Sequence, residues 1–346
     1  AALGYKIFWN KRGAVLIGGQ NLNPRNESAY VEEMTRQISG EMYWEYNGDT
    51  DFVPVKTLQD AVKFPAVTEK MVADAIAAKN QQDVHPRLIA TKDDINRIKG
   101  LVAEGDAFMT AAYDKLMKEA AKSWSYETPV YGLDDAGLRV AAMHSMGTQV
   151  LPILGLAYQL TGDKKYVTEA WRYYEAFAGF TDWGAPRHFL DVGVGGTYMA
   201  IGYDLMYDAF SKDQRAVIED AFKTFAVDPG WAGMNKPEFW TDSNANWNPI
   251  CQTGIRLCCY MLYDKDPEYY GQIITTALNR QTHYYRAFEP DGQSAEGIGY
   301  FNYGFSFTEL GNQVDLNVLG TDFGLMDTDG IRNAGWFPYR ISGTAA

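Results

Sequence analysis

Residues 151–177 read LPILGLAYQLTGDKKYVTEAWRYYEAF, and the predicted fold follows from the pattern in these residues. An apolar segment at 151–159 is followed by the polar break TGDKK at 161–165. Residues 166–177 then carry apolar side chains at the spacing of an amphipathic helix. The pattern predicts two helices joined by a short turn, which is a helical hairpin.

The same pattern returns twice along the chain, at roughly 50-residue intervals. Residues 198–210 and 214–225 flank a break at Ser211, and residues 257–263 and 268–278 flank the break DKDP at 264–267. Ser211 and the pair Asp266-Pro267 are typical helix starts. Repeated helical hairpins stack into a solenoid or close into an α/α toroid. We therefore expect a mainly α fold, an incomplete α/α toroid whose interhairpin loops line a central cleft.

The first 84 residues differ from this helical pattern. Short strands are predicted at 5–9 and 13–17, with a turn at 11–13, and a further strand at 51–55 leads into a helix near 57–64. The segment FVPVKTL at 52–58 resembles the strand–helix unit of copper-amine-oxidase-N-like modules. We expect a small α+β accessory segment over 1–84 and the toroid domain over 85–335. An extended connector, HPRLI at 85–89, precedes a capping box formed by Thr91 and Asp94.

Composition narrows the classes of partner. The 346-residue chain is 46% hydrophobic, enough for a large core, and its net charge of −13 argues against nucleic acid as a partner. Aromatic residues make up 14% of the chain, which suits a sugar-binding cleft as well as an aromatic core. No apolar run reaches the ~18 residues that a membrane span needs. The start at Ala1, without Met or a signal-peptide pattern, is what we expect of a mature or excised fragment.

The three cysteines are Cys251, Cys258 and Cys259. They contain no CxxC pair, and histidines are too sparse nearby for a zinc site. We expect them to be small core residues, and we predict no metal site and no cofactor in the chain.

The segment SNANWNP at 243–249 is the first candidate for chemistry. It places Asn244, Asn246 and Asn248 around Trp247, just before an apolar helix over 250–262. Capping by Asn246 or Asn248, with Pro249 in the first turn, is the structural alternative. Capping explains one asparagine but not three beside a tryptophan, so we also predict contacts with substrate.

The second candidate is PDGQSAEGIGYFNY at 290–303. Glu296, Tyr300 and Tyr303 have the spacing to share one helical face. A tyrosine-rich core stripe with a capping glutamate is the alternative. Gly297 and Gly299 each weaken a helix by roughly 1 kcal/mol, and they favour a place where substrate approaches the backbone.

Aromatic, glycine-rich loops are predicted at 181–188, 229–233 and 240–244, and loops often carry binding residues. Among the histidines, His188 is the best functional candidate. His85 and His144 look structural, and His283 is expected at the surface or as a cap.

Three tryptophans and one arginine in these segments are candidates for substrate binding. Arg187 could bind a carboxylate or a sulfate, or it could be a solvated or capping residue. Trp183, Trp240 and Trp247 are candidate sugar platforms, with core packing as the alternative.

Over roughly residues 85–340 the chain resembles the heparinase II/III-like polysaccharide lyases and their alginate-lyase relatives. The likeness rests on HPRL at 85–88, LGLAY…TGD at 154–163, NWN at 246–248 and DG…EG…Y at 291–300, in this order. The resemblance implies an α/α toroid followed by a β-sandwich, and cleavage of uronic-acid polysaccharides by elimination. It also implies a secreted, periplasmic or cell-surface protein with an acidic polysaccharide as its partner.

The resemblance also implies roles for single residues. An asparagine binds the uronate carboxylate, and here Asn246 is preferred over Asn248. A tyrosine acts as general acid, with tyrosine or histidine as base. Tyr300, 54 positions after Asn246, matches this tyrosine, and Tyr303 is the second choice. A tyrosine that acts as base needs a cationic neighbour to lower its pKa.

The sequence departs from the family pattern in two respects. No histidine follows the asparagine segment, and residues 336–346 read as the first strand of a β-domain that is truncated or supplied by a second chain. The resemblance allows a structural divalent metal in that β-domain.

Two other functions remain open. An α/α-barrel glycoside hydrolase needs two carboxylates across the scissile bond, and Asp191, Asp242 and Glu296 could be recruited although no pair is evident. A non-catalytic polysaccharide-binding or assembly module is the other alternative.

Overall fold

The computed structural model describes residues 6–9, 15–18, 44–46, 52–54 and 59–341, and this part of the chain is mainly helical. Two short antiparallel hairpins precede the helices. Strand β1 (Lys6–Trp9) pairs with β2 (Val15–Gly18), and β3 (Trp44–Tyr46) pairs with β4 (Phe52–Pro54). The three predicted strands are therefore present, whereas the predicted turn at 11–13 lies outside the described residues.

The main helices, in chain order, are α3 (Glu69–Lys79), α4 (Lys92–Ala103), α5 (Ala107–Lys122), α6 (Met146–Thr161), α7 (Lys165–Ala178), α8 (Leu190–Met206), α9 (Lys212–Phe222), α10 (Asp228–Asn235), α11 (Trp247–Leu262), α12 (Pro267–Arg286), α13 (Gly297–Val318), α14 (Asp329–Ala334) and α15 (Phe337–Ile341). A 3₁₀ turn, η3 (Ala141–His144), precedes α6, and a π-helical segment, η5 (Lys223–Val227), joins α9 to α10.

The polar breaks end and start helices where the sequence predicts. Gly162 closes α6 in the left-handed conformation, at φ 73°. Ser211 and Asp266 accept backbone N–H bonds at the starts of α9 and α12, and Thr91 forms the predicted capping box of α4. One other expectation is wrong, because residues 229–233 are not a loop but part of α10. Of the helix expected near 57–64, residues 59–61 are helical, residues 62–64 are not, and residues 57–58 lie outside the described part. Phe64 precedes Pro65, and the residue before proline avoids the helical conformation.

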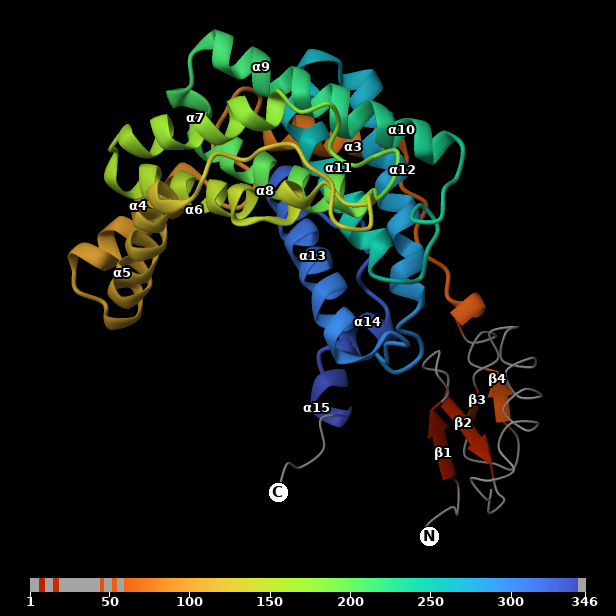
Figure 1. Cartoon of the computed structure of the whole chain (residues 1–346). Coiled ribbons are helices and arrows are strands. Elements are labelled where there is room, and N and C mark those ends of the chain that lie inside the picture. The colour runs from red at the N-terminus through yellow and green to blue at the C-terminus, as the bar shows by residue number, and fades with distance from the viewer. Residues whose placement is uncertain (1–5, 10–14, 19–43, 47–51, 55–58, 342–346) are drawn as a thin grey trace.

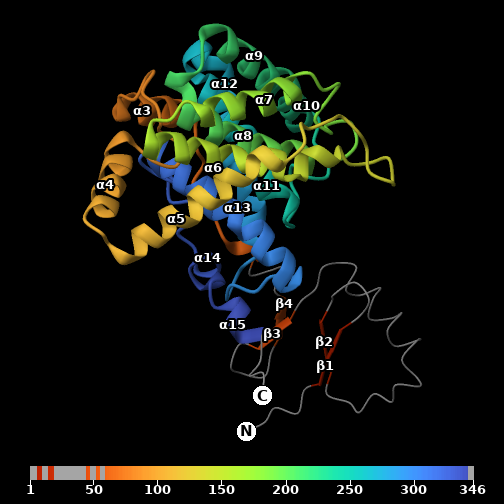
Figure 2. The ribbon, with the colours of Figure 1, turned by 60° about the vertical axis from the view of Figure 1, so that its left-hand side comes forward.

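The core lies between helices that pack side by side. Helix α6 contacts α8, α8 contacts α11, and α11 contacts both α12 and α13. A Cβ at Gly254 would lie 2.3 Å from the Gly193 carbonyl oxygen, so α11 and α8 cross backbone to backbone. Helix α8 is buried along almost its whole length. In both views α13 runs out from this body toward α14 and α15 (Figure 1 and Figure 2).

The three cysteines lie in the buried interior of α11 and are free thiols, as predicted. None of the helices within the described residues is both long and apolar enough to cross a bilayer.

The helical body begins before residue 84. Helix α3 packs against α12, and Asn279 exchanges two hydrogen bonds with the Val67 backbone, of 3.0 and 2.8 Å. Part of the segment expected to be a separate accessory unit therefore lies on the helical body.

The strand expected over 336–346 is wrong for residues 337–341, which form α15. Phe337 is buried against Phe301, with ring centroids 5.2 Å apart, and Arg340 N–H donates to the Trp336 carbonyl. One helical turn buries Phe337 while leaving Tyr339 exposed, and this packing decides its conformation. Residues 342–346 lie outside the described part.

Candidate functional site

Asn246 stands at the start of α11 and is held by Glu296, the residue before α13. The Asn246 side-chain amide donates to Glu296 Oε1 and its backbone N–H donates to Oε2, both at 2.6 Å. The Asn246 side chain therefore does not cap its own helix, although the structural alternative predicted such a cap. Asn246 Oδ1 is buried and has no hydrogen-bond partner among the described residues. The clamp by Glu296 thus leaves an oriented amide with an unused acceptor.

Burial raises the pKa of the Glu296 carboxyl, and the two bonds from Asn246 oppose that rise. Charged hydrogen bonds contribute roughly 1.5–3 kcal/mol each, so the clamp also joins the ends of two helices firmly.

Helix α13 passes very close to Asn246 at Gly304. A Cβ at this position would lie 2.9 Å from Asn246 Cα and 2.6 Å from the Tyr284 hydroxyl oxygen. Only glycine permits this approach. Tyr303 is the residue that precedes Gly304 in α13.

Tyr303 is half-buried, and burial is the main cause of its raised pKa. Negative charge at Asp191 raises the pKa further, and Arg139 opposes the rise. The expectation of a tyrosine with a lowered pKa is therefore wrong for Tyr303, which keeps its proton at neutral pH. Tyr300, one turn earlier on α13, is 60% exposed.

The other two asparagines of the segment have different surroundings, although Asn248 Oδ1, like Asn246 Oδ1, is buried without a hydrogen-bond partner among the described residues. Asn248 is buried, and its amide donates to the carbonyls of Thr241 (2.8 Å) and Arg280 (3.2 Å). It ties α11 to the preceding loop and to α12, which is a structural role. Asn244 is exposed.

A histidine–aspartate cluster, which we define as His144, His188 and Asp191, lies at the start of α8. His188 Nδ1 is hydrogen-bonded to Asp191 Oδ1 at 2.8 Å, and His144 Nε2 lies 2.7 Å from the same oxygen. The other oxygen, Oδ2, accepts the Val140 N–H at 2.7 Å. The sequence indicated His188 but assigned His144 a purely structural place within a helix. His144 instead ends η3 and faces the same carboxylate, and no local signal in the sequence predicts this contact.

Trp247 joins the cluster to the asparagine segment. Its ring lies edge-to-face against His188, with centroids 4.7 Å apart, and also contacts Phe239, which is 70% exposed. Trp247 remains partly exposed and follows Asn246 directly. The candidate site therefore comprises Asn246 with Glu296, Trp247, Tyr303 and the histidine–aspartate cluster.

Three predicted binding residues are committed to other contacts. Arg187 pairs with Asp182 at 2.6 Å and donates to the Tyr131 hydroxyl. Trp183 and Trp240 are buried, and Trp240 stacks on Phe189 at 4.3 Å. Because their faces are covered, neither tryptophan can serve as a sugar platform, and both take the alternative role of core residues.

The remaining charged candidates are also paired. Asp242 forms an ion pair with Arg280 and lies 3.5 Å from His283. His85 is buried and hydrogen-bonded to Asp204 at 2.7 Å, which agrees with a structural role. Asp191 and Glu296 also accept hydrogen bonds from protein groups. All three carboxylates considered for a glycosidase pair therefore already have partners within the protein.

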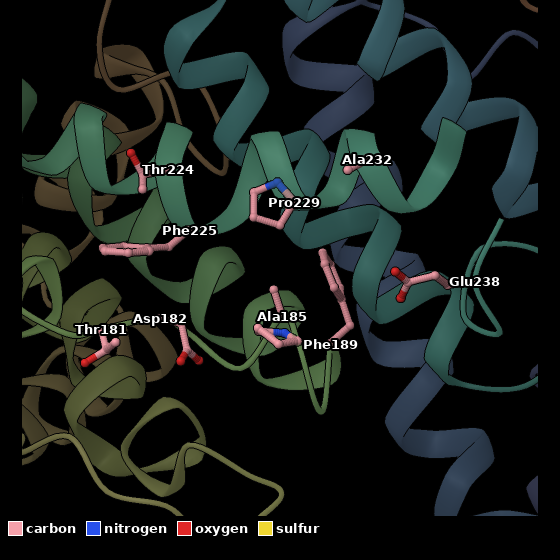
Figure 3. Close-up of a pocket in the computed structure, with 10 residues that line it drawn as sticks. Thr181, Asp182, Ala185, Phe189, Thr224, Phe225, Pro229, Ala232 and Glu238 are labelled. Carbon is pink, nitrogen blue, oxygen red and sulfur yellow. The ribbon is translucent and has the colours of Figure 1, made fainter. Parts of the chain in front are cut away.

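A cavity of about 400 Å³ lies beside the 181–189 loop (Figure 3). Phe189 lines it, while the neighbouring His188 faces Trp247. Its two carboxylates are already engaged, Asp182 by Arg187 and Glu238 by Trp240 Nε1. We place the candidate site at Asn246 because the unused polar atoms lie there and not along the cavity, whose lining is Thr181, Asp182, Ala185, Pro186, Phe189, Thr224, Phe225, Pro229, Ala232 and Glu238.

No protein-family model matches the chain, and no curated protein is detectably similar to it in sequence.

Proposed function

We propose that the chain is the helical part of a polysaccharide lyase that cleaves uronic-acid-containing polysaccharides by β-elimination. In this proposal the hairpins belong to an α/α toroid, which works with a β-sandwich from elsewhere in the protein or from a second chain. The protein acts outside the cytoplasm. The observation that carries it is the clamped Asn246, whose buried Oδ1 has no hydrogen-bond partner among the described residues and which α13 approaches closely at Gly304, the residue after Tyr303.

The chemistry requires that the charge of the uronate carboxylate be neutralised as the C5 proton leaves. A side-chain amide has two N–H donors and one acceptor oxygen. Glu296 takes one N–H of Asn246, so the second can donate to the substrate carboxylate. Glu296 acts here as a positioning residue.

The two tyrosines of α13 divide the proton transfers. Tyr300, in its phenolate form, accepts the C5 proton and becomes a neutral phenol, the electrons of the C5–H bond form the C4–C5 double bond, and the bond from C4 to the glycosidic oxygen breaks. Tyr303 donates its proton to the departing oxygen, a role that suits a phenol whose pKa is raised by burial. Trp247 offers a partly exposed ring on which a sugar can stack, and Asn244 lies at the exposed edge.

The test supplies the complete protein with alginate, heparan sulfate and hyaluronan. Product formation is followed by the ultraviolet absorbance of the unsaturated uronate, and products are identified by mass spectrometry. Tyr303→Phe should lower turnover by about 100-fold or more, whereas Tyr339→Phe, on the exposed side of α15, should not.

Three results would contradict the proposal. Reducing ends without unsaturated product would indicate hydrolysis, and binding without turnover would indicate a binding or assembly module. Unchanged turnover in a folded Tyr303→Phe variant would remove Tyr303 from the mechanism.

A further inference from the structure

We infer that the histidine–aspartate cluster binds one divalent transition-metal ion of the zinc class. The inference rests on the positions of His144, His188 and Asp191, and it does not depend on the proposed elimination reaction.

The cluster offers a complete set of donors for such an ion. One nitrogen from each histidine and one oxygen from Asp191 lie within 4.8 Å of one another. Zinc binds imidazole nitrogen at about 2.0–2.1 Å and carboxylate oxygen at about 2.0–2.2 Å. Two histidines and one carboxylate are a ligand set that leaves a fourth position open for water or a substrate oxygen.

The state of His144 Nε2 favours a metal over hydrogen bonds alone. This nitrogen is buried and lies 2.7 Å from Asp191 Oδ1, yet the geometry between them is not that of a directed hydrogen bond. A buried polar atom without a hydrogen bond costs about 1–3 kcal/mol. An ion between the two histidines and the carboxylate would take the lone pair of this nitrogen and remove that cost.

The residues around Asp191 hold its carboxylate in position to bind a metal ion. Asp191 is fully buried, and Val140 N–H binds Oδ2 at 2.7 Å, which leaves Oδ1 for both histidines. Gly184 packs against the same side chain so closely that a Cβ there would lie 2.8 Å from Oδ2. Contacts of this kind, made to the groups that bind the ion, orient the ligands of metal sites.

The ligand chemistry predicts which ions bind. Imidazole nitrogen suits Zn²⁺ and Co²⁺, whereas Mg²⁺ and Ca²⁺ prefer sets made of oxygen alone. The His144 side chain is 24% exposed, which provides a route of entry for an ion.

The test uses the complete protein after treatment with a chelator. Titration with Co²⁺, followed by visible absorption and calorimetry, should show one equivalent bound with the intense bands of low-coordinate Co²⁺. Zn²⁺ should displace it and Mg²⁺ should not. His188→Ala and His144→Ala should weaken Co²⁺ binding by about 100-fold or more. The matched control is His283→Ala, because His283 lies beside a carboxylate at a separate, half-exposed position.

Failure of the wild-type protein to bind Co²⁺ or Zn²⁺ would overturn the inference without any variant. Equal weakening by His283→Ala, or no weakening by His144→Ala and His188→Ala in folded protein, would overturn it too. Because none of these measurements uses a polysaccharide, a failed lyase assay and a failed metal titration remain distinct results.

Discussion

Replacing Glu296 tests the clamp on which the candidate site depends. The carboxylate accepts two N–H groups of Asn246 at 2.6 Å. Glu296→Gln keeps the shape but retains only one acceptor oxygen, and it removes the cost of burying a charge. We therefore expect it to lower the free energy of unfolding by about 1–2 kcal/mol. Glu296→Ala leaves both donors unpaired, so we expect a loss of about 3 kcal/mol or more.

The Glu296 variants should lower both the stability and the turnover of the protein, but to different extents. Denaturant unfolding measures the stability, and the unsaturated-product assay separates kcat from KM. An Asn246 that has lost its orientation should lower kcat by roughly 100-fold, the usual effect of losing one donor that stabilises the transition state. The controls are Glu268→Gln and Glu268→Ala at an exposed position of α12, expected within about 0.5 kcal/mol of wild type.

The decisive result is how the two variants compare in free energy of unfolding and in kcat. If Glu296→Ala were as stable as Glu296→Gln, the two bonds would not carry the energy assigned to them. If both variants kept full kcat, Asn246 would not need Glu296 and the positioning role would be refuted.

Three further predictions concern packing, a buried ion pair and pH. Gly304→Ala should destabilise the protein by about 1–3 kcal/mol in thermal or denaturant unfolding, because its Cβ would meet atoms at 2.6 and 2.9 Å. Gly299→Ala on the same helix meets nothing within 4 Å and should be neutral or stabilising by up to about 1 kcal/mol; equal effects of the two changes would contradict the close approach. Asp315→Ala should cost about 3–5 kcal/mol, since it leaves the fully buried Arg256 guanidinium without its 2.9 Å partner, and a loss below 1 kcal/mol would show that water reaches the pair. Burial raises the pKa of Glu296 above its ordinary value of 4.5. The contribution of Glu296 to stability is therefore greatest below pH 4.5 and declines as pH rises through the raised pKa. The stability difference between wild type and Glu296→Gln should fall over this pH range, and a difference that rises would contradict the direction of the pKa shift.

Local chemistry explains what the sequence predicted well. Helix starts at Thr91, Ser211 and Asp266 depend on a side chain and a backbone N–H only two or three residues apart. The helical hairpins follow from apolar periodicity and from polar breaks, which are equally local. The asparagine and tyrosine segments were identified in the same way, by residue types that packing alone does not explain.

Which of these residues contact one another depends on the tertiary structure. His144 reaches Asp191 because α8 begins beside the end of η3, and Glu296 reaches Asn246 because Gly304 lets α13 pass α11 closely. Trp183, Trp240 and Trp247 are equally good candidates for sugar platforms from the sequence. Helix packing buries the first two and leaves Trp247 partly exposed. Residues 337–341 form a helix because Phe337 finds a partner in Phe301. Sequence periodicity fixes which face of a helix is apolar, whereas contacts between distant residues depend on how closely the helices approach, and that is a property of the folded chain.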